Sequence, residues 1–196
     1  MAEIKKAKVV DKWKLKGWYS VIAPDTFDSK EFGQIVSSDE KNLKNRRIRI
    51  GLGELTGSFT QTNAFTTLFF RIGEIKGKSA YAIFIGHELS SGYIKTLLRR
   101  RRSIVYQVDD VVARDGGKMR IKSVAVTANR VSENVRQDIR RLISSEIRVH
   151  VKEMDMPTLV QEVVFGKLSS RVFAKLKKLT PMRRFELRKS ELVETL

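Results

Sequence analysis

The sequence predicts an α+β protein: an antiparallel β-barrel or sandwich-like domain, followed by C-terminal helices and a final strand that returns to the sheet. Up to about residue 130, apolar and polar residues mostly alternate with the period of two that is typical of strands. From Ser132 onward, apolar residues recur with the helical period of about 3.6. The segment MRRFELRK, near residues 182–189, alternates again and predicts the returning strand.

The strands are expected in the following order. WYSVIAP begins at Trp18 and ends at Pro24, and RIRIGL, from Arg47, alternates isoleucine and leucine with arginine. FTTLFFRIGEI and SAYAIFIG are separated by Gly77-Lys78, which predicts a hairpin. SIVYQVDDVVA and KMRIKSVAVTA flank Asp115-Gly116-Gly117, a stronger hairpin signal because glycine accepts a positive φ.

A short helix is expected from Leu89 to Arg102, between the two hairpins. Its apolar side would hold Ile94, Leu97 and Leu98, and it would end in four consecutive arginines, residues 99–102. Adjacent like charges destabilise a fold unless something anionic neutralises them. The run is therefore the most pronounced basic feature of the sequence.

After Ser132, which is expected to cap a helix, three helical pieces are predicted. The first carries an apolar stripe from Val135 to Met154. The second covers about 158–165 and ends at Gly166, and the third covers about 169–179 and ends before Pro181. These elements suggest three segments: a flexible basic arm at 1–16, a β-rich barrel-like domain at 17–130, and a helical segment with the terminal strand at 131–196, packed on the barrel.

The arm holds six lysines against two acids. With nothing apolar to anchor it before Trp13, it is expected to be mobile in the free protein and ordered only when a partner is bound. The two tryptophans admit two interpretations, as core anchors or as platforms for nucleic-acid bases. For Trp18 the core interpretation is favoured, and for Trp13 the two are balanced.

Charge is the strongest indication of function. The chain has 39 Lys and Arg against 22 Asp and Glu, a net charge of +17. A folded domain with this charge repels itself, and a phosphate polymer is the commonest anion that relieves the repulsion. The alternatives are an ordinary basic soluble protein and a peripheral membrane protein. Membrane binding is disfavoured because Met1-Ala2 lacks a myristoylation glycine and the chain has no cysteine.

Catalytic motifs are scarce. The two histidines, His87 and His150, lie far apart, and no phosphate-binding or dinucleotide-binding glycine motif is present. Asp109 and Asp110 are adjacent on a predicted strand, so they should point to opposite faces and share neither a metal nor a proton. Without cysteine, thiolate metal sites and cysteine nucleophiles are excluded. We therefore expect no enzyme, no cofactor and no metal, and, with no signal peptide, a cytoplasmic protein.

Several motifs together resemble one family. They are DKWKLKGWYSVIAP, the Phe32-Gly33 pair, GHEL at Gly86–Leu89 followed by YIKTLLRRRR, and PMRRFELRKSEL near the end. In this order they are similar to the archaeal and eukaryotic small-subunit ribosomal protein family called S-three-a-e, or S-one-e. The length, and the end of the chain soon after the last motif, are of the archaeal type.

The resemblance implies a structural protein of the small ribosomal subunit, located on the platform beside the mRNA exit. Its partners would be the 3′ region of the small-subunit rRNA, neighbouring small-subunit ribosomal proteins, and mRNA near the exit. It also implies a β-barrel-like domain with C-terminal helices. The rival hypotheses are a free-standing RNA-binding regulator or RNA-processing factor and, more distantly, an RNA-modifying enzyme.

Arginine is well suited to phosphate because its planar guanidinium donates paired hydrogen bonds. The candidate RNA-binding residues are basic positions in five segments of the chain, together with one tryptophan. They are Lys12, Trp13, Lys14, Lys16, Arg46, Arg47, Lys95, Arg99, Arg100, Arg101, Arg102, Arg136, Arg140, Lys175, Lys177, Lys178, Arg183 and Arg184. About half of them are expected to be solvated surface charges without direct RNA contact.

Overall fold

The computed structural model describes residues 11, 13–58 and 61–193. The strands are β1 (Gly17–Ile22), β2 (Glu31–Ser37), β3 (Arg47–Gly51), β4 (Thr66–Lys76), β5 (Ser79–Leu89), β6 (Ile104–Val112), β7 (Lys118–Thr127) and β8 (Met182–Leu192). The helices are α1 (Leu52–Thr56), α2 (Gln61–Ala64), α3 (Ser91–Leu97), α4 (Glu133–Lys152), α5 (Met156–Val164) and α6 (Lys167–Leu179). Two 3-10 turns lie at Asp25–Phe27 and Glu40–Asn42.

The strands form one eight-stranded sheet. Its order is β2-β1-β5-β8-β7-β6, and β4 pairs with both β3 and β5. The pairs β1–β2, β5–β8, β6–β7 and β7–β8 are antiparallel, whereas β1 and β5 run parallel. The α+β class and the returning strand are therefore confirmed. Among the described residues the sheet is open, with β2 and β6 at the two ends of the order.

The chain divides into two compact units, which are described separately. The first comprises residues 1–48 and 71–83, and the second residues 49–70 and 84–196. In the first unit, Leu43, Ile72 and Ala80 form a buried cluster, against which Tyr19 and Ile35 pack. The basic arm falls mostly on residues outside the described part of the chain, and the three-segment division remains a prediction.

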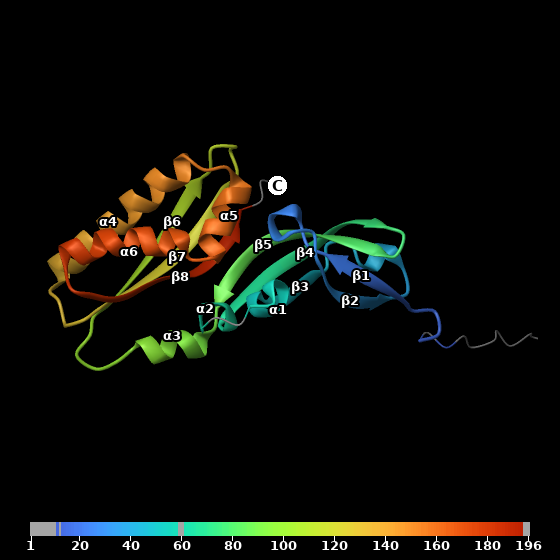
Figure 1. Ribbon diagram of the computed structural model, residues 1–196, viewed down its shortest axis with the longest axis horizontal. Coiled ribbons are helices and arrows are strands. Elements are labelled where there is room, and N and C mark those ends of the chain that lie inside the picture. Colours follow the sequence, from blue (N-terminus) through green and yellow to red (C-terminus); the bar gives the residue numbers. More distant parts are fainter. Residues whose placement is uncertain (1–10, 12, 59–60, 194–196) are drawn as a thin grey trace, which may run out of the picture. The chain divides into compact units, whose positions relative to one another are not determined.

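The second unit is a sheet covered by helices. Helices α4 and α6 lie over one face of β6, β7 and β8 (Figure 1). Fully buried side chains repeat every fourth residue along α4, at Ile139, Ile143, Ile147 and Val151, so the helix presents one apolar stripe to the sheet. The change of period at residue 132, the three helices and the final strand are all confirmed.

The two hairpins also form where expected. β4 and β5 are joined at Gly77-Lys78, and β6 and β7 pair antiparallel across residues 113–117. Gly116 has φ of +85°, a left-handed conformation that glycine adopts without steric cost. The turn chemistry of Asp115-Gly116-Gly117 therefore fixes the register of the β6–β7 pair.

The helix expected at 89–102 is shorter. Leu89 ends β5, and α3 covers only Ser91–Leu97. Leu98 already has the extended angles φ −80° and ψ 108°, and Arg101 is left-handed with φ of +63°. Continuing the helix would place four like charges within about one turn, with Arg99 and Arg102 on the same face, and this repulsion opposes helix formation. The four arginines therefore belong to the loop between α3 and β6.

The core assignment of Trp18 is wrong. Alternation along β1 turns Tyr19 and Val21 toward the core, while Trp18, opposite Val36 of β2, faces outward. Its side chain is 63% exposed. A strand that begins WYS can bury either aromatic residue, and the sequence does not reveal the register that decides between them.

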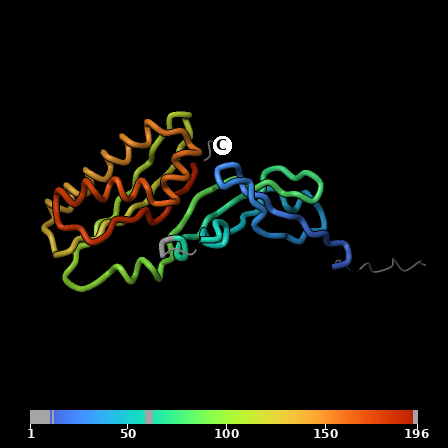
Figure 2. The backbone as a smooth tube through the Cα atoms, viewed as in Figure 1, coloured from blue at the N-terminus to red at the C-terminus, as the bar shows by residue number. Residues whose placement is uncertain are grey.

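Two motifs singled out by the sequence meet at the pairing of β5 with β8. Gly86, His87 and Glu88 lie opposite Glu191, Ser190 and Lys189, respectively. Figure 2 follows the chain from α6 into β8, which runs between β5 and β7. We call this contact the β5–β8 seam. It joins the GHEL segment to the KSEL end of the chain.

Candidate nucleic-acid interface

The arginine loop after α3 and the start of β8 line the same pocket in the second unit. Arg99 and Arg102 come from the loop, and Arg183 and Arg184 from β8. The pocket has a volume of about 670 Å³, and its lining is completed by Tyr93, Thr96, Leu97 and Val126. Two basic segments that lie far apart in the sequence are therefore brought together, and we call this site the arginine pocket.

The helix beneath the loop is held by apolar packing. Tyr93 and Ile94 are buried in a cluster with Leu89, Val124 and Val126, and Leu97 packs against it. The apolar side of the segment YIKTLL thus anchors α3 on β7. The arginines that follow are carried to the surface, where Arg99, Arg100 and Arg101 are exposed and Arg102 is half-buried.

One carboxylate partly neutralises the pocket. The Arg184 Nε donates to Glu186 Oε1 at 2.7 Å, and the Tyr93 hydroxyl donates to the same oxygen at 3.3 Å. Burial raises the pKa of Tyr93, and the negative charge of Glu186 adds to this effect. Burial alone would lower the pKa of Arg184, but the hydrogen bond and charge of Glu186 outweigh it, and the net shift is upward.

The other three guanidinium groups lack such a partner. Within the described part of the chain, no carboxylate forms an ion pair with Arg99, Arg102 or Arg183. Three uncompensated positive charges around one concave surface repel one another until an anion binds. Arg100 and Arg101 are exposed on the same loop but do not line the pocket, and Lys95 lies exposed on α3.

Several other candidate residues make contacts within the protein. Arg136 and Arg140 both bind Glu133, at 3.0 and 3.1 Å, on α4. Lys175 of α6 forms an ion pair with Glu146 of α4 and so ties the two helices together. These charges are already compensated, so their role in RNA binding remains a prediction.

Two lysines near the end of α6 remain at the surface. The Lys177 Nζ lies 4.6 Å from the centroid of the Phe173 ring, a cation–π contact. Lys178, one position on, is exposed. Neither lines the arginine pocket.

The remaining candidates belong to the first unit. Lys14, Arg46 and Arg47 are exposed there, and Lys16 lies against the ring of Trp13. Lys12 lies outside the described residues. The exposed Trp18 joins this group, although the core interpretation was favoured for it; the available signal was its place two residues after Lys16.

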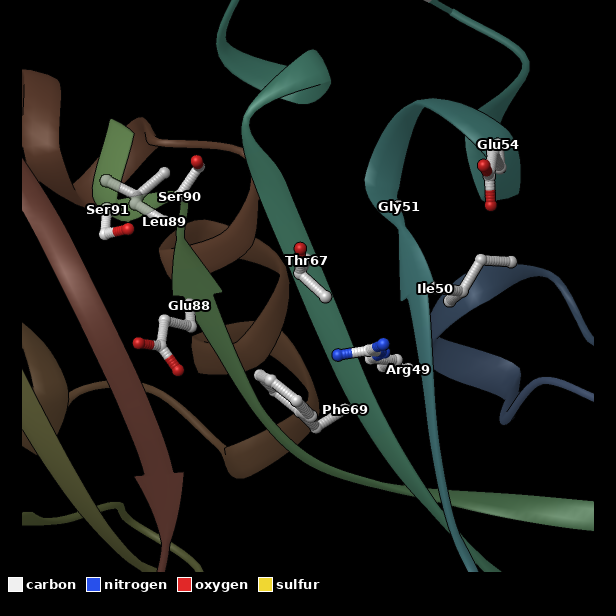
Figure 3. Close-up of a pocket in the computed structure, with 10 residues that line it drawn as sticks. All are labelled: Arg49, Ile50, Gly51, Glu54, Thr67, Phe69, Glu88, Leu89, Ser90 and Ser91. Atoms are coloured by element: carbon white, nitrogen blue, oxygen red, sulfur yellow. The ribbon is translucent and has the colours of Figure 1, made fainter. Parts of the chain in front are cut away.

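A further pocket of the second unit, of about 530 Å³, has mixed charge (Figure 3). Thr67 and Phe69 on β4 stand between Arg49 on β3 and Glu88 on β5. Glu54 also lines it. Arg49 is the one cation that lines this pocket, beside Glu54 and Glu88, and Glu88 is paired with Lys189 at 3.7 Å. Four arginines line the arginine pocket, which is therefore the better candidate anion site.

Both aspartates of the acidic pair on β6 make contacts within the protein. Asp109 is buried, accepts a hydrogen bond from Ser144 at 2.6 Å and faces α4. Asp110 is exposed on the other face and forms a bidentate ion pair with Arg120, whose Nε and Nη2 donate to the two carboxylate oxygens at 2.6 and 2.8 Å. The expectation that the two carboxylates point apart is confirmed.

Metal ligands and membrane-spanning helices can be assessed in residues 11, 13–58 and 61–193. These residues hold no group of three or more His, Asp or Glu side chains placed to bind a metal ion. None of their helices combines the length and the apolar character needed to cross a membrane.

The fold and the arginine pocket define a basic α+β protein in which two distant segments form one positively charged pocket. Comparison with known proteins then gives the family. The sequence model of the Ribosomal S3Ae family matches residues 4–195, and the chain belongs to this family. The archaeal-type resemblance indicated by its motifs is confirmed.

The curated relatives match over nearly their whole length. The small ribosomal subunit protein eS1 of Sulfurisphaera tokodaii is 34% identical over 189 residues, covering 96% of this chain and 97% of the relative. Its counterpart in Sulfolobus acidocaldarius is 36% identical, covering 99% and 98%. That of Saccharolobus islandicus is 35% identical, covering 95% and 88%.

Proposed function

We propose that this protein is a structural constituent of the small ribosomal subunit, where it binds rRNA through contacts between its basic side chains and RNA phosphates. Membership in the Ribosomal S3Ae family supports a structural, non-enzymatic role on the ribosome. In finer detail, we propose a position on the platform near the mRNA exit of the cytoplasmic ribosome. The partners would be the 3′ region of the small-subunit rRNA, neighbouring ribosomal proteins and mRNA.

The observation that carries the proposal is the arginine pocket. Arg99, Arg102 and Arg183 line it without a carboxylate partner among the described residues. Each guanidinium laid against a phosphate releases condensed counterions from the RNA, which favours binding at low salt. Because the planar guanidinium donates in pairs, the pocket suits a sharply folded phosphate backbone.

Replacing Arg99, Arg102 and Arg183 together by Gln should weaken binding to an rRNA fragment from the 3′ region. Each lost phosphate contact reduces the magnitude of the slope of log affinity against log salt concentration by roughly 0.7–0.9. For three lost contacts, the magnitude of this slope should fall by roughly 2 to 3. Filter binding at several salt concentrations measures this. Stability should change little, because Arg99 and Arg183 are exposed, Arg102 is half-buried without an ion-pair partner among the described residues, and charges at the surface contribute about 0–1 kcal/mol each.

The matched control is the triple variant Arg114→Gln, Arg141→Gln, Lys152→Gln. These three cations are exposed in the same unit and do not line the pocket, so the variant removes the same net charge. It should keep most of the wild-type salt slope. Equal losses in the two variants would mean that net charge alone, and not the pocket, binds the RNA.

Sedimentation distinguishes the ribosomal proposal from a free-standing RNA-binding regulator. Tagged protein in a cell extract should co-migrate with small subunits through a density gradient. Protein that remains in the free fraction at low salt would favour the regulator instead.

A further inference from the structure

Within residues 11, 13–58 and 61–193, the two most exposed aromatic side chains lie together in the first unit. Trp13 is 71% exposed and Trp18 is 63% exposed, and they are the two tryptophans of the protein. Both line a pocket of about 590 Å³ together with Lys16, Gln34, Val36 and Arg46, as well as Ile35. We call this site the tryptophan pocket. Two large aromatic surfaces left in water at one place are unusual for a folded domain and mark a binding site.

Local hydrogen bonds and charge hold Trp13 in position. Its backbone N–H donates to the Asp11 Oδ1 at 3.0 Å, and its carbonyl accepts from the Lys16 N–H at 3.2 Å, which closes a turn. The Lys16 Nζ then lies 3.6 Å from the centroid of the indole ring. This cation–π contact fixes the ring and leaves a positive charge beside it.

The sheet holds Trp18. It pairs with Val36 in the β1–β2 register, and its neighbour Tyr19 is packed in the core, so the outward direction of Trp18 is fixed by the strand. Arg46 reaches the same surface, where its Nη1 donates to the Val36 carbonyl at 3.4 Å. The tryptophan pocket therefore combines two indoles with two cations, and none of its lining residues is acidic.

We infer that the tryptophan pocket binds unpaired RNA bases, which stack on Trp18 and Trp13 while Lys16 and Arg46 contact the adjoining phosphates. Every base has a π-face, but in a duplex both faces are covered by neighbouring base pairs, so only single-stranded RNA can use the site. The inference rests on the proposed function for the partner class. The tryptophan pocket would contact RNA bases, whereas the arginine pocket is proposed to contact RNA phosphates.

The position of the tryptophans provides a direct readout. Because both of them line this one pocket, the intrinsic tryptophan fluorescence of the full chain reports on it alone. A single-stranded oligouridylate should quench the fluorescence. An oligomer of the same length that lacks the bases should bind more weakly and quench little, and an RNA duplex should also quench little.

Substitution of Trp18 separates stacking from charge. Trp18→Ala should weaken oligouridylate binding by about tenfold to a hundredfold, the range seen when a stacking platform is removed. Its salt slope should stay as in the wild type because no phosphate contact is lost. Trp18→Phe should recover part of the affinity. The control is Tyr106→Ala, which removes an aromatic residue that is 47% exposed on β6 of the other unit, and it should bind as the wild type does.

The outcomes separate this inference from the proposed function. The arginine triple variant should keep the quenching at saturating oligouridylate, and Trp18→Ala should keep its salt slope on rRNA. Absence of quenching by oligouridylate, with the arginine effect intact, would overturn base stacking and leave the proposed function standing. If Trp18→Ala lowered co-migration with small subunits but left oligouridylate binding unchanged, the pocket would dock a protein, and the inference would be wrong.

Discussion

A Gly86→Ala variant should lose about 3 kcal/mol or more of its free energy of unfolding, a cost above the usual range for overpacking. A Cβ atom at this position would lie 2.0 Å from the backbone carbonyl oxygen of Ser190 and 3.3 Å from the Glu191 Cα. Both neighbours are backbone atoms of β8, which cannot turn aside as a flexible side chain could. To make room, β5 and β8 would have to separate at the seam.

Denaturant unfolding of the wild type and of Gly86→Ala, monitored by circular dichroism, measures this loss in the free energy of unfolding. The matched control is Gly33→Ala on β2, where a Cβ would meet nothing within 4 Å. The control should unfold close to the wild type and could gain about 0.4–1 kcal/mol, because alanine restricts the unfolded chain. Gly86→Ala and Gly33→Ala proteins of equal stability would show that the seam tolerates the extra atom.

The elements of the fold could be predicted from the sequence because they depend on local patterns. The apolar stripe of α4 appears in the spacing of its isoleucines, and the turn between β6 and β7 appears in Asp115-Gly116-Gly117. Each of these signals operates over one or two turns of chain. These local patterns do not depend on how the helices and strands pack against one another, so the fold class and the order of the elements were predictable.

Pairings between distant segments were beyond local reasoning. The motifs GHEL and KSEL could be singled out, but nothing in either indicates that they meet; His87 and Ser190 are 103 positions apart. The same holds for the register of β1, which turns Tyr19 inward and Trp18 outward. A shift of one residue would reverse the two, and only the pairing with β2 fixes it.

The candidate interface was predictable as a set of basic segments and not as a site. The sequence placed Arg99, Arg102, Arg183 and Lys175 in one group by charge. The structure separates them by partner: the three arginines share a pocket, while Lys175 joins α6 to the Glu146 carboxylate of α4. Tertiary packing decides which cations form ion pairs between elements. A count of Lys and Arg in the sequence therefore overestimates how many side chains are available to bind RNA.

Acid should destabilise the protein through His87, a buried residue of the seam. The side chain is only 2% exposed. The Leu187 carbonyl, 3.1 Å away, can only accept, so the Nε2 of the neutral ring carries the proton, and the Nδ1 accepts from the Ser190 hydroxyl at 2.6 Å. Burial lowers the pKa of His87 from 6.5 to about 4, although the hydrogen bond to Leu187 acts in the opposite direction.

The sign of the effect follows from proton uptake. Between pH 6.5 and about 4, the unfolded chain binds a proton at this histidine and the folded protein does not, so the free energy of unfolding falls as the pH falls. Below pH 4 both states are protonated and this contribution levels off. A shift of this size corresponds to a loss of about 3 kcal/mol across the window.

Urea unfolding at a series of pH values between 7 and 4 tests this, with His87→Gln as the decisive variant. The glutamine amide can still donate to Leu187 but does not titrate. The variant should therefore be less stable than the wild type at pH 7, and its free energy of unfolding should fall by about 3 kcal/mol less than that of the wild type between pH 7 and pH 4.

His150→Gln is the matched control at the other histidine. Because it leaves His87 in place, it should retain the full acid-induced loss. Parallel curves for the wild type and His87→Gln would mean that the acid sensitivity comes from the carboxylates, and that the buried imidazole of the seam accepts a proton without opening the fold.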